Sequence, residues 1–133
     1  MMMRRGSGWF IDLEGNARFR ITDLVQPRHP LILKLAEGKT PKQIYEYIVN
    51  NVRYDDEPPF RFYLIHPEAP EAVVLIAPKG FKPSDLVEYV VNNRRGNCVG
   101  KSILVCSLLQ SIGVESYVSL GNIRKAVREE LES

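Results

Sequence analysis

The sequence predicts an α+β fold in which a buried helix packs on a small, mainly antiparallel sheet. Residues 103–112 are almost continuously apolar, which is typical of a helix buried on all sides. Residues 9–13 and 17–21 flank a short loop that contains Gly15, and the second arm alternates apolar and basic residues. That alternation indicates a half-exposed hairpin strand. The chain of 133 residues is long enough for one domain.

Within this single domain (1–133) we expect three parts. Residues 1–38 form the N-terminal hairpin and a short helix that ends at Gly38. Residues 39–121 form the core. Residues 122–133 form a last helix, because an apolar residue recurs every fourth position after Asn122.

The core opens with a helix whose start is marked by three residues. Thr40 suits the cap, Pro41 the first helical position, and Gln43 completes a capping box. The helix should run to residue 52 or 53 and carry one apolar stripe, formed by Ile44, Tyr45, Ile48, Val49 and Val52.

The middle of the chain predicts two strands and then two helices. Residues 60–65 and 73–76 read as strands around a Pro-rich turn that contains His66. Ser84 or Asp85 caps a helix that extends to about Val91. The buried helix then begins near residue 98 and ends at Gly113, and a core strand follows at 114–120.

Composition excludes several classes of function. A net charge of +2 is too small to indicate a nucleic-acid-binding protein. The basic residues 1–5 precede no apolar segment of a signal peptide, and the longest apolar run, 72–77, is too short to cross a membrane. We therefore expect a cytoplasmic protein without a membrane segment. Few glutamines beside many Arg and Glu residues indicate, weakly, a thermophile.

The two cysteines and two histidines lack the close pairing of a zinc site, so no metal is expected. Cys98 and Cys106 would lie about 12 Å apart along one helix, which is too far for a disulfide. Residues 96–102 (GNCVGKS) resemble a phosphate-binding loop. However, its first glycine should stand at position 95, which is Arg95, and a helix precedes it instead of a strand. We therefore predict no cofactor.

Cys98 is the strongest candidate for a catalytic residue. At the start of a helix, free N–H groups and the positive end of the dipole stabilise a thiolate and could stabilise an oxyanion. Arg94, Arg95 and Lys101 add positive charge nearby. In contrast, Cys106 lies in the middle of the helix among apolar residues, so we expect an inert core thiol.

Three segments resemble the transglutaminase-like (papain-like thiol) superfamily. They are residues 95–98 (RGNC), 111–114 (SIGV) and 116–121 (SYVSLG), and the likeness extends back to residue 40. The resemblance implies a Cys-His-Asp triad in that chain order, in which Cys attacks an amide or ester carbonyl. Cys98 matches the first member, but residues 122–133 contain no His or Asp. The family pattern therefore looks truncated after the Cys-bearing helix and the following strand.

Three explanations stay open for the incomplete triad. The chain is a fragment, or a minimal relative that serves as a binding or assembly module, or an upstream histidine acts as the base. His66, at a hairpin tip, is the better candidate, whereas His29 resembles a surface loop residue. The preferred hypothesis is acyl transfer or hydrolysis at protein or peptide amides, and the alternative is a non-catalytic module. An unpaired strand edge at 114–120 also predicts a homo-oligomer or a protein partner.

Overall fold

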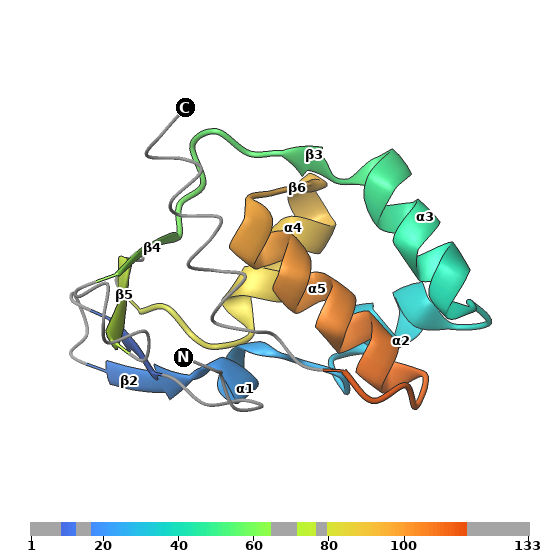
Figure 1. Cartoon of the computed structure of the whole chain (residues 1–133), viewed down its shortest axis with the longest axis horizontal. Helices are drawn as coiled ribbons and strands as arrows, with labels where there is room; N and C mark the ends of the chain where they lie inside the picture. Colours follow the sequence, from blue (N-terminus) through green and yellow to red (C-terminus); the bar gives the residue numbers. More distant parts are fainter. Residues whose placement is uncertain (1–8, 13–16, 65–71, 77–79, 117–133) are drawn as a thin grey trace.

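The computed structural model describes residues 9–12, 17–64, 72–76 and 80–116 (Figure 1). Its elements confirm the α+β class. In chain order they are β1 (Trp9–Asp12), β2 (Ala17–Arg20), α1 (Ile21–Leu24), α2 (Pro30–Ala36), α3 (Pro41–Asn51), β3 (Arg53–Tyr54), β4 (Arg61–Leu64), β5 (Ala72–Ile76), α4 (Asp85–Asn93), β6 (Arg95–Gly96) and α5 (Cys98–Ser111).

The strands form two separate sheets. The larger has the order β2-β1-β5-β4, with β1 antiparallel to β2, β4 antiparallel to β5, and β1 parallel to β5. The predicted hairpin is present, with Phe10 opposite Phe19. The predicted pair of strands on either side of His66 is also present, but the turn with His66 itself lies outside the described residues.

The smaller sheet consists of β3 and β6, which are parallel. It is the sheet that contacts α5, so the prediction of a mainly antiparallel sheet beside the cysteine helix is wrong on this point. The reason is the connection between its strands. Both strands begin where a helix has just ended, and the chain returns from β3 to β6 through α4. A long connection that contains a helix is what joins parallel strands.

Helix α5 lies at the centre of the helical part and contacts α2, α3 and α4 (Figure 1). Its buried residues cover about half of the helix circumference, and the residues on the remaining side, such as Lys101, Val105 and Leu109, are half-buried. The prediction of a helix buried on all sides is therefore correct only in part. The largest fully buried side chains in the described part come from α5 and the helices around it: Leu24, Ile32, Ile44, Ile103, Leu104 and Leu108. The core therefore forms around the helix that begins at Cys98.

The capping box of α3 is confirmed. Thr40 Oγ1 accepts a hydrogen bond from the Gln43 amide at 3.2 Å, and Gln43 Oε1 accepts one from the Thr40 amide at 2.8 Å. The apolar stripe is narrower than predicted. Ile44, Ile48 and Val52 are buried. The adjacent Tyr45 and Val49 are 68% and 59% exposed, so this part of the helix surface faces away from the core.

The start of α4 differs from the local prediction, whereas the end of α5 agrees with it. Ser84 makes no side-chain cap, and the Asp85 carboxylate instead accepts a hydrogen bond from the Lys82 amide at 2.8 Å. At the end of α5, Gly113 has a φ of +84°, the left-handed conformation expected of a glycine after a helix. Residues 114–116 are not in a strand, and the rest of the predicted strand and the last helix lie outside the described residues.

Candidate active site

Cys98 is the first residue of α5 and is half-buried. Asn97 caps this helix, because its Oδ1 accepts a hydrogen bond from the Gly100 amide at 2.9 Å and its carbonyl accepts one from the Lys101 amide at 2.9 Å. Ser102 donates its hydroxyl to the Cys98 carbonyl at 2.7 Å. The cysteine thus lies at a helix N-terminus whose geometry is fixed by a polar cap.

The chain on either side of Cys98 lies directly against α4 at two glycines, Gly96 in β6 and Gly100 in the first turn of α5. A Cβ on Gly96 would lie 3.2 and 3.3 Å from the two methyl groups of Val90, and a Cβ on Gly100 would lie 3.1 Å from one of them. Val90 is buried, so it has little room to move. Glycine therefore allows β6 and the first turn of α5 to approach α4, and this approach sets the position of Cys98.

A buried carboxylate that sequence reasoning did not find also holds this turn. Asp55 is 3% exposed and follows β3. Its oxygens accept hydrogen bonds from the Tyr89 hydroxyl at 2.6 Å and the Glu57 amide at 3.1 Å. The Arg95 guanidinium lies 3.8 Å away, and the Asp55 amide donates to the Gly96 carbonyl at 3.2 Å. Asp55 therefore joins α4 to the strand that leads into Cys98.

The same contact changes the ionisation of Tyr89. Its hydrogen bond to Asp55, followed by burial and the negative charge of Asp55, raises the pKa of Tyr89, and Arg95 opposes this shift. Burial likewise raises the pKa of Tyr47, against a smaller opposing effect of Arg94. Both phenols are neutral when protonated, so folding favours their protonated form.

We expect the protein to lose stability at alkaline pH, partly through Tyr89. A group whose pKa is higher in the folded protein stabilises it fully below the unfolded-state pKa, about 10 for tyrosine, and this stabilisation is lost as pH rises through the folded value. We expect the free energy of unfolding, measured with urea at pH 8, 10 and 11, to decrease less with rising pH in Tyr89→Phe than in the wild type. Tyr45→Phe, at an exposed phenol, is the control. If the free energy of unfolding of Tyr89→Phe decreases with pH as steeply as that of the wild type, Tyr89 does not contribute to the loss of stability.

Cys106 is buried in α5, as the sequence predicts. Burial raises the pKa of the Cys106 thiol, while contacts with the Ser116 hydroxyl at 3.5 Å and the Gln110 side-chain amide at 3.4 Å lower it to a smaller extent. Both cysteines are free thiols. Cys106 thus has the environment of an inert core residue, whereas Cys98 is accessible at a helix end.

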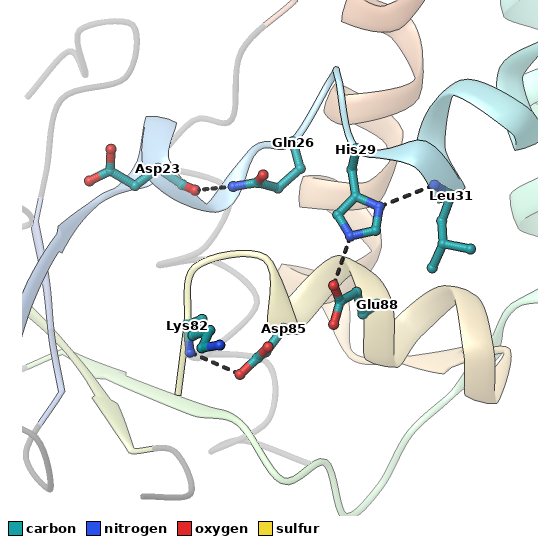
Figure 2. A network of polar contacts seen from close by, with 7 residues as sticks. All are labelled: Asp23, Gln26, His29, Leu31, Lys82, Asp85 and Glu88. Atoms are coloured by element: carbon teal, nitrogen blue, oxygen red, sulfur yellow. Dashed lines mark hydrogen bonds and ion pairs between the residues drawn. The ribbon is translucent and has the colours of Figure 1, made fainter. Parts of the chain in front are cut away.

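His29 is not the exposed loop residue that the sequence suggests. Its Nδ1 accepts a hydrogen bond from the Leu31 amide at 3.1 Å and caps α2 (Figure 2). Its Nε2 lies 2.7 Å from the Glu88 carboxylate on α4 (Figure 2). Both ring nitrogens are therefore engaged in joining α2 to α4. His66, the other candidate base, lies outside the described residues.

Comparison with known families agrees with this geometry. A family model described as the transglutaminase-like superfamily matches residues 33–130, which include α3, α4 and the cysteine helix α5. The chain belongs to the transglutaminase-like superfamily. Neither a search of curated proteins nor a search of solved structures found a match. The matched range contains Cys98, the first residue of the central helix α5.

Two further features concern the described residues alone. None of their helices is long and apolar enough to cross a membrane. In the same part of the chain, no group of three or more His, Cys, Asp or Glu side chains is arranged to hold a metal ion.

Proposed function

We propose that this transglutaminase-like domain acts on protein or peptide amides through Cys98. The thiolate attacks the carbonyl carbon, and a C–S bond forms as the carbonyl oxygen takes up the electron pair. The C–N bond then breaks, and the amine leaves with a proton supplied by a general acid. The resulting thioester passes its acyl group to water in hydrolysis or to a second amine in acyl transfer.

The position of Cys98 at the start of α5 is the observation that carries this proposal. The cap uses the amides of Gly100 and Lys101. We assign the two preceding amides, those of Cys98 and Val99, as donors to the oxyanion of the intermediate. The positive end of the α5 dipole stabilises the attacking thiolate.

The general base is the part of the proposal that depends on residues beyond the described structure. His29 is engaged with Leu31 and Glu88, so its use as a base would break both contacts. We therefore propose that His66, or a group supplied by a further segment or partner, takes and returns the proton. This proposal keeps the predicted pair of Cys98 as nucleophile and His66 as base.

Alkylation of Cys98 tests the proposal. An ordinary thiol has about 1% thiolate at pH 6.5, so the unfolded chain reacts slowly with iodoacetamide. We expect folded Cys106→Ser protein, which retains Cys98, to react at least about tenfold faster than the same variant in denaturant. Burial alone can only slow the folded reaction, so a faster rate reports a stabilised thiolate.

Two variants complete the alkylation experiment. Cys98→Ser protein, which retains Cys106, should react more slowly when folded than when unfolded, because that thiol is buried. His66→Gln should reduce the rate of Cys98 if His66 is the base. If Cys98 is alkylated no faster in the folded protein than in the unfolded chain, the enzyme proposal is contradicted.

A non-catalytic module for macromolecular binding or self-assembly is the second candidate. The exposed Tyr45 and Val49, one turn apart on α3, favour it, because such apolar side chains mark interaction surfaces. Sedimentation over a range of protein concentrations tests self-assembly. If the outer face of α3 is the interface, Tyr45→Lys should shift the distribution towards monomer.

A further inference from the structure

A basic pocket that is open to solvent lies where α3 and α4 end, and the residues that line it are exposed. Its volume is about 310 Å³, and the described residues that line it are all arginine or asparagine. They are Asn50, Asn51, Arg53, Asn93, Arg94 and Arg95. Arginine and the asparagine amide supply many N–H donors. Among these six residues there is no carboxylate, although Asp55 lies 3.8 Å from the Arg95 guanidinium. We refer to these six residues as the Arg/Asn pocket.

Two of the arginines are neighbours across the small parallel sheet. Arg53 on β3 is in register with Arg95 on β6, and the Arg53 amide donates to the Arg94 carbonyl at 2.9 Å. Paired residues on adjacent strands place their side chains on the same face of a sheet. Like charges in such positions repel each other, and an anion between them removes the repulsion.

The third arginine occupies a strained backbone position. Arg94 ends α4 with φ 54° and ψ 37°, the left-handed conformation in which glycine or asparagine is usual. It is the one non-glycine residue with positive φ in the described part of the chain. A residue kept in an unfavourable conformation suggests a use for its side chain, and here the residue lines the pocket.

The hydrogen bonds that cap the ends of α3 and α4 come from asparagine side chains and do not explain the presence of the arginines. Asn51 and Asn93 each donate a side-chain amide to the carbonyl one turn earlier, of Tyr47 at 3.0 Å and of Tyr89 at 2.9 Å. Within the described residues, the ion pair made by these arginines is that of Arg95 with Asp55 at 3.8 Å. Among the described residues, the guanidinium groups of Arg53 and Arg94 are therefore not held in an ion pair.

We propose that the Arg/Asn pocket binds an oxyanion of the phosphate class. Planar guanidinium groups donate pairs of parallel hydrogen bonds to phosphate oxygens, and three arginines line this pocket. The site goes beyond the proposed function and stands even if Cys98 is not a nucleophile.

Titration with inorganic phosphate, followed by amide NMR at constant ionic strength, tests the site. We expect saturable shifts centred on residues 50–53 and 93–96, and no such shifts with chloride. Arg53→Gln should weaken binding about tenfold. Arg94→Gly should weaken it by a similar factor and leave the melting temperature unchanged or higher, because glycine adopts the left-handed conformation without strain.

Arg28→Gln is the matched control, because it removes one positive charge from an exposed residue outside the pocket. It should bind phosphate as the wild type does. A phosphopeptide and its unphosphorylated form then distinguish a phosphate carried on a peptide from the free ion. Equal weakening in Arg28→Gln and Arg53→Gln, or shifts that never saturate, would overturn the proposal and leave only general attraction to a basic surface.

Discussion

Asp55→Ala is expected to reduce the free energy of unfolding by about 3 kcal/mol, because it removes two hydrogen bonds made to a buried carboxylate. The Tyr89 hydroxyl loses its partner at 2.6 Å, and the Glu57 amide loses its partner at 3.1 Å. The change also leaves a cavity, because the Asp55 side chain that it removes is buried, with Asp55 only 3% exposed. We do not assign the loss to Arg95, whose side chain is 52% exposed and can interact with water.

Urea unfolding of Asp55→Ala, Asp55→Asn and Asp56→Ala measures this effect. Asparagine keeps the size of the side chain and one acceptor oxygen, so we expect a smaller loss. Asp56 is the exposed neighbour, and its replacement should change stability by no more than about 0.5 kcal/mol. Equal losses at Asp55 and Asp56 would contradict the role given to the buried carboxylate.

The consequence of Asp55→Ala should extend to Cys98. Asp55 contacts the strand that leads into α5 through Arg95 and the Gly96 carbonyl. If this contact positions the first turn of α5, alkylation of Cys98 should slow in the folded variant under conditions where it remains fully folded. An unchanged rate would indicate that the close packing of Gly96 and Gly100 on Val90 is sufficient on its own.

Features that depend on residues close in sequence could be predicted. The cap of α3 involves residues three positions apart, and the start of α5 follows from the change from polar to apolar residues near Cys98. The glycine after α5 is equally local. Each of these predictions is correct because local hydrogen bonds and helical periodicity decide the structure there.

Features that depend on distant residues could not be predicted. Asp55 meets Tyr89 across 34 positions of sequence, and His29 meets Glu88 across 59. Nothing local separates the buried Asp55 from the exposed Asp56. The parallel direction of β3 and β6 has the same origin, because it depends on where α4 returns the chain. Tertiary packing, which no short pattern encodes, decides these points.

Leu104→Ala in α5 should reduce the free energy of unfolding by about 3 kcal/mol, the usual cost of removing a buried leucine side chain and leaving a cavity. Leu104 is 0% exposed in the helix that contacts α2, α3 and α4. Val105→Ala is the matched control, because Val105 is the next residue on the same helix and is partly buried. We expect Val105→Ala, which removes fewer atoms, to reduce the free energy of unfolding by about 1 kcal/mol.

The same pair of variants separates the stability of α5 from the chemistry at its N-terminus. Leu104 lies more than one turn beyond Cys98, so folded Leu104→Ala should alkylate Cys98 at the wild-type rate at a temperature well below its melting point. Such a result places the determinants of reactivity in the cap and first turn of α5. If alkylation slows in proportion to the loss of stability, the reactivity of Cys98 instead depends on how firmly the whole helix is packed.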